Sequence, residues 1–242
     1  MSQASNITAL ILAGGFGTRV KDLLEELPKP MAPAHGKPFI EWIVRWLKAQ
    51  TIRDVIISAG YRAEVLEEYF AASPVPDMNV NCVTESEPMG TGGGLAFAAN
   101  ACTTQPDAWL VLNGDSLILT DIKSVIPALN RGEGVVVTRR VTDTSRYGRV
   151  QLDESNRIID FHEKQPGQGQ INAGVYLLKH SLISTFPESR PLSLESQVFP
   201  KLIHHSSGLF AHPVEAPFLD IGTPETLPLA DAFISDNLDQ FS

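Results

Sequence analysis

The stretch LILAGGFGTR, Leu10–Arg19, comes directly after an apolar run that begins at Ile7. Its three glycines allow a tight turn and bring backbone N–H groups against phosphate oxygens without a Cβ in the way. Arg19 closes the loop with a guanidinium that can hold a phosphate through two parallel hydrogen bonds. The stretch is not a Walker A loop, since no Gly-Lys-Ser/Thr follows, and the third glycine of a dinucleotide motif would fall at Val20. It predicts a strand and a phosphate-binding loop, although a plain tight turn needs the same glycines.

Strands and helices alternate through the first half of the chain. Apolar, β-branched runs predict strands at Ile7–Leu12, Val55–Ala59, Asn79–Val83 and Trp109–Asn113, and amphipathic patterns between them predict helices at Phe39–Ala49, Ala63–Phe70 and Gly92–Ala101. This alternation implies right-handed crossovers. It predicts an α/β fold with a doubly wound, mostly parallel, Rossmann-like sheet.

The second half has a different pattern. Glu154–Asn156 is a turn between Arg149–Asp153 and Arg157–Phe161, and the three segments together predict an inserted β-hairpin. Further elements are expected as a strand at Asn172–Leu178 and helices at Leu194–His205 and Thr223–Phe233. No repeat or linker divides the sequence, so we expect a single domain over residues 1–242.

Composition excludes several classes of protein. The 242 residues carry a formal net charge of −9, which argues against non-specific binding to nucleic acid. No apolar run approaches the roughly 20 residues that span a bilayer, and Met1–Asn6 lacks the pattern of a secretory signal. Cys82 and Cys102 are too far apart for a metal knuckle or a redox pair. We therefore expect a cytoplasmic protein with reduced thiols and no membrane or nucleic-acid partner.

A second cationic segment follows the glycine loop. Lys29 stands between two prolines in Pro28–Met31, which fix the backbone around it, and Gly36–Phe39 then opens a helix. A lysine in a loop is usually only solvated. Held by prolines beyond a phosphate-type loop in an acidic protein, this lysine is predicted to meet a phosphate.

At this point the sequence resembles the sugar-1-phosphate nucleotidyltransferase family, on Leu12–Arg19 followed by Pro28–Met31. Further matching segments occur in family order, at Glu85–Gly93, Leu112–Asp115, Arg146–Arg149, Phe161–Lys164, Asn172–Gly174 and Leu219–Thr223. The resemblance implies transfer of a nucleoside monophosphate from a nucleoside triphosphate to a sugar 1-phosphate, with release of pyrophosphate. It also implies a nucleotide-binding half of about residues 1–120, a sugar-binding half of about residues 121–242, Mg²⁺ as the cofactor, and a possible homo-oligomer.

Two aspartates are the candidate metal ligands. Asp115 ends the strand predicted at Trp109–Asn113, and Asp220 precedes the helix predicted near Thr223. Each alone is equally a turn former or a cap. Mg²⁺ prefers one or two carboxylates together with substrate phosphates and water, and the resemblance assigns Asp115 and Asp220 that role. The catalytic residues implied are Arg19, Lys29, Asp115 and Asp220.

The resemblance also places the substrates. The nucleotide is expected at Leu12, Ala13, Gly14, Gly15, Gly17, Thr18, Arg19, Lys29, Glu85, Pro88, Gly90, Thr91 and Asp115, and the sugar phosphate at Tyr147, Gly148, Glu163, Lys164, Asn172, Gly174 and Glu195. Glu195 is equally a first-turn carboxylate of a helix, and Asn172–Gly174 is equally a strand bulge. A carboxylate at Glu85 suits the two adjacent donors of guanine better than uracil or thymine.

Within the family, Gly14–Arg19, Pro28–Pro33 and Pro88–Gly93 look most like guanylyltransferases acting on D-glycero-α-D-manno-heptose 1-phosphate. The alternatives are an N-acetylmuramate 1-phosphate uridylyltransferase, or another hexose 1-phosphate nucleotidyltransferase. Outside enzymes, the alternative is a catalytically inactive regulatory paralogue. Such a paralogue would tend to lose phosphate cations or metal carboxylates, whereas this chain retains the whole set: Arg19, Lys29, Asp115, Lys164 and Asp220.

Overall fold

The computed structural model describes residues 6–103, 105–162, 165–204 and 207–242. A sheet of nine strands runs through the molecule in the order β10-β9-β11-β6-β1-β4-β5, and β8 and β12 are attached to it through β11. Its parallel part consists of β1 (Ile7–Ala13), β4 (Asp54–Ala59), β5 (Asn79–Thr84) and β6 (Ala108–Asn113). The register pairs Leu12 with Asn113 and with Ser58, so these strands end at the same edge of the sheet.

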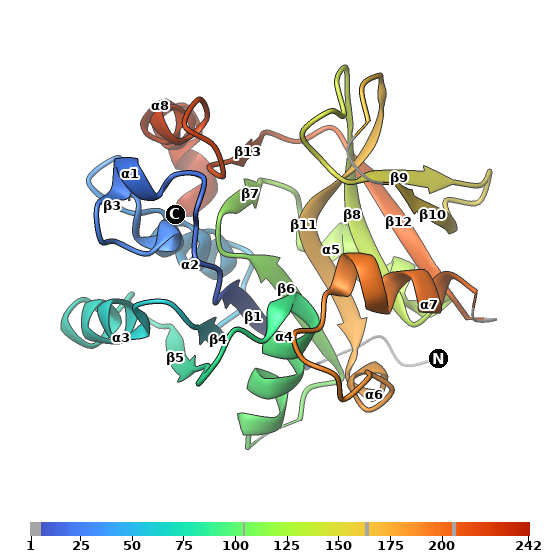
Figure 1. Ribbon diagram of the computed structural model, residues 1–242, viewed down its shortest axis with the longest axis horizontal. Coiled ribbons are helices and arrows are strands. Elements are labelled where there is room, and N and C mark those ends of the chain that lie inside the picture. Colours follow the sequence, from blue (N-terminus) through green and yellow to red (C-terminus); the bar gives the residue numbers. More distant parts are fainter. Residues whose placement is uncertain (1–5, 104, 163–164, 205–206) are drawn as a thin grey trace.

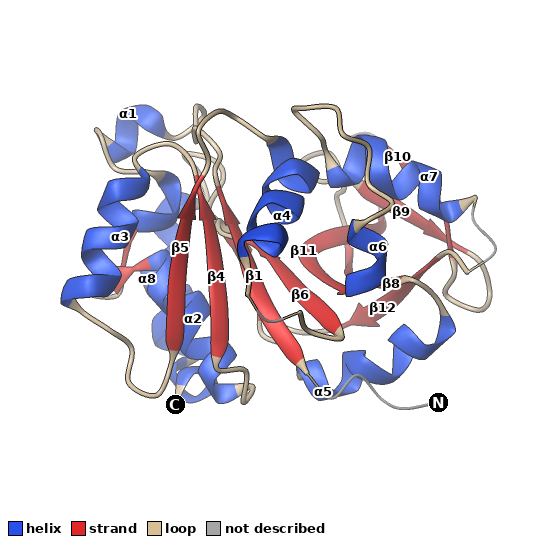
Figure 2. Cartoon of the chain, turned by 90° about the horizontal axis from the view of Figure 1, so that it is seen from below, coloured by secondary structure: helices blue, strands red, loops and turns tan. Residues whose placement is uncertain are grey.

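Helices cover both faces of this sheet (Figures 1 and 2). Successive residues of a strand point to opposite faces: Ala9 and Ile11 belong to one apolar cluster and Leu10 to the other. The first cluster is completed by α2 (Phe39–Ala49), α3 (Ala63–Ala72) and α8 (Ala230–Asp236), and the second by α4 (Gly90–Ala101) and α7 (Phe199–Ile203). The predicted doubly wound α/β fold is therefore present.

The second half of the chain extends the same sheet. The long strand β11 (Gly169–Lys179) pairs antiparallel with β6 through Val175–Lys179, and with β8 (Gly134–Val141) along most of its length. The predicted hairpin is confirmed as β9 (Arg149–Leu152) and β10 (Ile158–His162). Two strands that the sequence reasoning did not predict, β8 and β12 (Leu209–Val214), run parallel to each other.

Short elements complete the chain. They are α1 (Lys21–Leu24), η1 (Lys29–Met31), β2 (Pro33–Ala34), β3 (Lys37–Pro38), β7 (Ser116–Ile118), α5 (Ile122–Val125), η2 (Ile126–Arg131), α6 (His180–Ile183), η3 (Leu194–Val198), β13 (Phe218–Asp220), η4 (Leu227–Leu229) and η5 (Leu238–Phe241). Among the described residues, no helix has the length and apolar character that crossing a bilayer requires.

Two predicted helices need correction. The helix expected at Thr223–Phe233 begins late, because Thr223–Thr226 forms a turn, η4 follows, and α8 starts only at Ala230. Proline disfavours a helical conformation in the residue before it, which restricts both Thr223 and Leu227. The helix expected at Leu194–His205 is divided into the π-helix η3 and the short α7, which ends at Ile203; His205 lies outside the described residues.

Both cysteines, Cys82 and Cys102, are half-buried. Burial and, to a smaller extent, the charge of Glu67 together raise the pKa of the Cys82 thiol to about 11. At pH 8 the reactive thiolate is then scarce, so we expect Cys82 to react with a thiol reagent roughly two orders of magnitude more slowly than an unperturbed cysteine. The rate is best measured in a Cys102→Ala variant. Equal rates for the folded and the urea-unfolded protein would contradict this prediction.

Candidate active site

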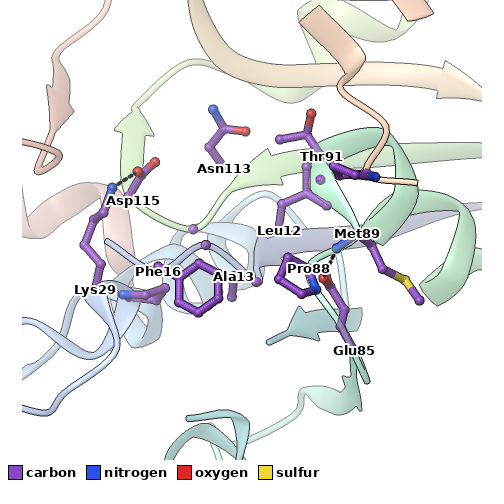
Figure 3. Close-up of a pocket in the computed structure, with 16 residues that line it drawn as sticks. Leu12, Ala13, Phe16, Lys29, Glu85, Pro88, Met89, Thr91, Asn113 and Asp115 are labelled. Carbon is purple, nitrogen blue, oxygen red and sulfur yellow. Dashed lines mark hydrogen bonds and ion pairs between the residues drawn. The ribbon is translucent and has the colours of Figure 1, made fainter. Parts of the chain in front are cut away.

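A pocket of about 350 Å³ opens at the carboxyl ends of β1 and β6, the edge at which open α/β sheets bind ligands (Figure 3). The glycine loop after β1, the segment around Lys29, the start of α4 and the turn after β6 form its walls. Its lining residues are Leu12, Ala13, Gly14, Gly15, Phe16, Lys29, Pro30, Glu85, Pro88, Met89, Gly90, Thr91, Asn113, Gly114, Asp115 and Pro191.

At one end of the pocket, Glu85 is fixed from three sides. Ser58 Oγ on β4 donates a hydrogen bond to Glu85 Oε1 at 2.7 Å, and the Met89 N–H donates to Oε2 at 3.3 Å. Gly14 lies against the same carboxylate, since a Cβ at Gly14 would stand 2.6 Å from Glu85 Oε1. Only glycine allows the loop to come this close. Ser58, which is completely buried, carries no signal in the sequence that links it to Glu85.

At the other end, Lys29 forms an ion pair with Asp115, with 2.5 Å between Lys29 Nζ and Asp115 Oδ2. Lys29 begins the short helix η1 between Pro28 and Pro30, as the sequence indicates, and its stem packs against Gly17. The side chain of Lys29 is 12% exposed and that of Asp115 is 30% exposed. The cation therefore comes from a stiff segment and is already drawn toward a carboxylate.

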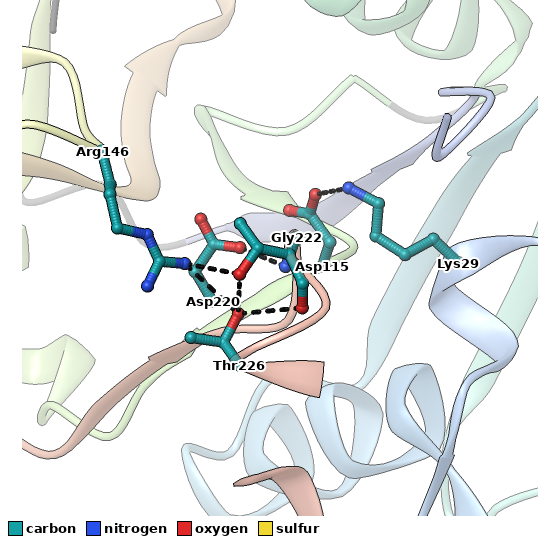
Figure 4. Close-up of polar contacts among 7 residues, drawn as sticks. Lys29, Asp115, Arg146, Asp220, Gly222 and Thr226 are labelled. Carbon is teal, nitrogen blue, oxygen red and sulfur yellow. Dashed lines mark hydrogen bonds and ion pairs between the residues drawn. The ribbon is translucent and has the colours of Figure 1, made fainter. Parts of the chain in front are cut away.

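Asp220 lies beside this pair. It ends β13, which pairs with β7 so that Asp220 stands opposite Ser116, and the Ile221 N–H donates to the backbone oxygen of Asp115. Burial and the charge of Asp115 raise the pKa of the Asp220 carboxyl. The Gly222 N–H and the cations of Lys29 and Arg19 lower this pKa, but by less, so the net shift is upward. Two carboxylates thus face one region, Asp115 from the turn between β6 and β7 and Asp220 from the end of β13 (Figure 4).

The donor set fits one kind of metal site. Within the described residues, no group of three or more His, Cys, Asp or Glu side chains could hold a metal ion by itself. Two carboxylates, Asp115 and Asp220, suit a divalent cation that prefers oxygen ligands and takes its remaining ligands from phosphates and water. A Zn²⁺ site built from four protein ligands does not fit these residues.

The first turn of α4 is held by a distant segment. The N–H groups of Gly92 and Gly93 donate to the Leu192 carbonyl oxygen at 2.8 and 3.2 Å, and the Leu192 N–H donates to the Met89 carbonyl oxygen. These two helix amides are therefore already bonded within the protein. Pro191 of the same segment lines the pocket, a contact that nothing in the local sequence predicts.

Four of the residues expected around the sugar, Tyr147, Gly148, Asn172 and Gly174, lie near one another, near Asp220 or near the turn after β6. The Asn172 N–H donates to the Gly148 carbonyl oxygen at 3.1 Å, and burial and the charge of Asp220 raise the pKa of Tyr147. Gly174 has a φ of +74°, and a Cβ there would lie 2.7 Å from Ser116 Oγ. Beside Asp220, Arg146 donates hydrogen bonds to Thr223 and Thr226 (Figure 4). Two expected sugar-site residues, Glu163 and Lys164, lie outside the described residues.

The pocket joins most of the residues expected at the nucleotide, namely Leu12, Ala13, Gly14, Gly15, Lys29, Glu85, Pro88, Gly90, Thr91 and Asp115. Gly17, Thr18 and Arg19 do not line it; Arg19 is exposed and acts on Asp220 through its charge. The sequence reasoning missed the lining residues Phe16, Pro30, Met89, Asn113, Gly114 and Pro191. All of these except Pro191 lie within the sequence motifs described above.

Comparison with known proteins agrees with this geometry. The family model described as nucleotidyl transferase matches residues 8–237. D-glycero-alpha-D-manno-heptose 1-phosphate guanylyltransferase of Campylobacter jejuni is 36% identical over 220 residues, which are 90% of this chain and 95% of the relative. Mannose-1-phosphate guanylyltransferase of Mycobacterium tuberculosis is 35% identical, over 90% of this chain but only 62% of that relative. The crystal structure of HddC from Yersinia pseudotuberculosis complexed with GMP-PN has a TM-score of 0.82 and 30% identity, over 93% of this chain and 97% of that one.

The chain belongs to the nucleotidyl transferase family. The predicted enzyme class, a sugar-1-phosphate nucleotidyltransferase, and the predicted fold are confirmed.

Proposed function

We propose that this protein transfers GMP from GTP to D-glycero-α-D-manno-heptose 1-phosphate, giving GDP-heptose and pyrophosphate. The observation that carries the proposal is a single pocket with a carboxylate at one end and a cation beside two aspartates at the other. Glu85 supplies the first end and Lys29 and Asp115 the second, and Asp220 lies next to Asp115 without lining the pocket. Support for the substrates comes from the C. jejuni relative, which is named for this reaction, and from the HddC structure, which holds a guanine nucleotide.

Charge determines what the protein must do in this reaction. A sugar phosphate has a second pKa of about 6, so the attacking oxygen is already ionised near neutral pH and needs no general base. The obstacle is repulsion between that phosphate and the triphosphate. In our proposal Arg19 and Lys29 neutralise the triphosphate and the departing pyrophosphate, while Lys164 holds the incoming phosphate in line.

Asp115 and Asp220 would hold Mg²⁺, which when bound supplies charge neutralisation at the reacting phosphate. Burial and, after it, the charge of Asp115 raise the pKa of Asp220, which supports repulsion between the two carboxylates before a cation arrives. Lys29 relieves part of this repulsion through its ion pair with Asp115. We infer that this ion pair keeps Asp115 turned toward the pocket and must loosen when Lys29 meets the triphosphate.

Base selection would rest on Glu85. Guanine presents two adjacent N–H donors, and a carboxylate can accept both, whereas uracil and thymine offer one donor flanked by carbonyl oxygens. The Ser58 hydroxyl and the Met89 N–H hold this carboxylate in one orientation at the pocket wall. A carboxylate fixed in this way favours guanine by charge and by geometry.

Glu85→Gln is expected to lower the ratio of kcat/KM for GTP to kcat/KM for UTP by about ten- to a hundredfold without abolishing turnover. The reason is that one hydrogen bond to a charged group contributes roughly 1.5–3 kcal/mol. The Gln side chain keeps the acceptor that Ser58 needs and loses the charge. The measurement is pyrophosphate release with each triphosphate varied, and Glu87→Gln, at an exposed neighbour, is the matched control. An unchanged GTP preference in the Glu85 variant would show that the base is recognised elsewhere.

The acceptor is tested with a matrix of sugar 1-phosphates against the four triphosphates. The proposal predicts that heptose 1-phosphate with GTP gives the highest kcat/KM. Mannose 1-phosphate is the competitor that the M. tuberculosis relative suggests, and N-acetylmuramate 1-phosphate with UTP represents the uridylyl alternative. A higher kcat/KM for either competitor would replace the proposed substrates and leave the transfer chemistry in place.

A further inference from the structure

A network of buried hydrogen bonds connects the two sides of the site. Tyr176 on β11 is completely buried, and its hydroxyl donates to Glu195 Oε1 at 3.0 Å and accepts from Asn172 Nδ2 at 2.8 Å. The other oxygen of Glu195 accepts from Thr91 Oγ1 at 2.8 Å and from Ser193 Oγ at 3.0 Å. A fully buried hydroxyl and a half-buried carboxylate are thus at the centre of this network.

The ends of the network are residues of the two subsites. Thr91 stands in the first turn of α4 and lines the nucleotide pocket, and its hydroxyl also accepts the Leu194 N–H at 2.8 Å. Asn172 stands on the sugar side, where its Oδ1 accepts the Gly174 N–H at 2.9 Å. The connection therefore crosses from α4 through η3 to β11.

This arrangement revises the expected role of Glu195. Its two oxygens are bonded to protein hydroxyls, and the amide group of Asn172 is oriented at both ends by Tyr176 and Gly174. Burying a carboxylate and a phenol here carries a desolvation penalty that an apolar pair would avoid. In return, a buried hydrogen-bond network holds the groups that it joins in one arrangement. The burial and the adjacent charge of Glu195 raise the pKa of Tyr176 well above its ordinary value, so the hydroxyl remains a donor.

We propose that Tyr176 and Glu195 are positioning residues, which touch no substrate and hold Asn172 and Thr91 in fixed register across the sugar and nucleotide subsites. The inference rests on the proposed function, because it takes Asn172 as a sugar contact. Since Tyr176 acts on the sugar through Asn172, its loss affects acceptor use more than nucleotide use.

The test is steady-state kinetics of Tyr176→Phe, which removes one oxygen and keeps the ring. We expect kcat/KM for the sugar phosphate to fall about ten- to a hundredfold, which is the range for loss of a hydrogen bond to a charged group. We expect the KM for GTP to keep its wild-type value. Tyr69→Phe is the matched control. It also removes a phenol that donates to a carboxylate, that of the buried Glu41, and Tyr69 packs against the other apolar cluster. This variant is expected to leave both kinetic constants unchanged.

A double-mutant cycle separates positioning from a structural role. If Tyr176 acts through Asn172, the double variant Tyr176→Phe/Asn172→Ala loses no more acceptor kcat/KM than Asn172→Ala alone. Additive losses, or a Tyr176→Phe variant with lower thermal stability and wild-type kinetics, would overturn the inference. Should Tyr176→Phe not fold, the same cycle is run with Glu195→Gln, which is expected to retain more activity than Glu195→Leu; equal losses in the two would count against the network.

The wild-type protein decides the proposed function separately. If it uses another triphosphate or another sugar 1-phosphate, the proposed substrates fail and the cycle is run with the pair that it does use. The inference about Tyr176 is then tested by the acceptor kcat/KM of each variant relative to that of the wild type, measured with that pair of substrates.

Discussion

Asp220→Asn and Asp115→Asn are each expected to lower turnover by on the order of 10²–10³ or more, the loss found when one group that stabilises transition-state charge is removed. An amide keeps the shape of the side chain and loses the charge that a divalent cation requires. Asp115 lies in the turn before β7 and Asp220 ends β13, the partner strand of β7; burial and the charge of Asp115 already raise the pKa of Asp220. Both variants are measured by pyrophosphate release at saturating Mg²⁺.

Stability provides the control for these variants. The carboxylate of Asp220 is disfavoured in the folded protein, so its replacement by a neutral amide is expected to leave the unfolding temperature unchanged or to raise it. The matched surface control is Asp236→Asn, at the exposed end of α8. Near-normal turnover in both site variants would refute the assignment of the metal carboxylates, and a large fall in unfolding temperature would attribute the lost activity to the fold.

Lys29→Ala is expected to lower kcat/KM for GTP by roughly a hundredfold, since it removes a preorganised cation from a partly dehydrated site. The Lys29 side chain is 12% exposed and its ammonium lies 2.5 Å from Asp115 Oδ2, so the variant also leaves that carboxylate without its partner. Lys37→Ala is the matched control. Lys37 pairs with the buried Glu41 at 3.0 Å, so its loss is expected to lower stability and to leave the handling of GTP unchanged.

A second lysine makes the Lys29 prediction more specific. The sequence resemblance assigns Lys164 to the incoming phosphate. Lys164→Ala is therefore expected to raise the KM for the sugar phosphate. Varying each substrate in turn distinguishes the two lysines. If Lys29→Ala and Lys164→Ala changed the same constants by the same factors, the two cations would not serve separate substrates.

The elements that the sequence predicted well are those with a strong local pattern. The helix Phe39–Ala49 has the predicted bounds, because its apolar residues recur at helical spacing and Pro38 stands before its first turn. The strands β8 and β12 were missed, since Gly134 opens one and Pro213 interrupts the other. Their pairing depends on contacts with β11 and with each other across a long stretch of chain.

The residues of the candidate site also divide into those that a local sequence pattern predicts and those that it does not. Residues of the glycine loop and the segments around Lys29 and Glu85 could be proposed from sequence, because their chemistry is carried by short contiguous motifs. Ser58 and Pro191 could not, since they reach the site only through the register of β4 and the folding of a distant segment onto α4. Glu195 is expected at the sugar phosphate from the sequence, but its bonds to the hydroxyls of Tyr176, Thr91 and Ser193 arise only in the folded chain.

One measurement tests the central claim most directly. The purified protein is incubated with GTP, heptose 1-phosphate and Mg²⁺, and phosphorus NMR follows the nucleotide sugar and pyrophosphate together. The proposed function predicts that GDP-heptose and pyrophosphate appear in equal amounts, only when both substrates are present, and that Asp115→Asn forms neither at a comparable rate. Folded wild-type protein that releases no pyrophosphate with any triphosphate and any sugar 1-phosphate would contradict it.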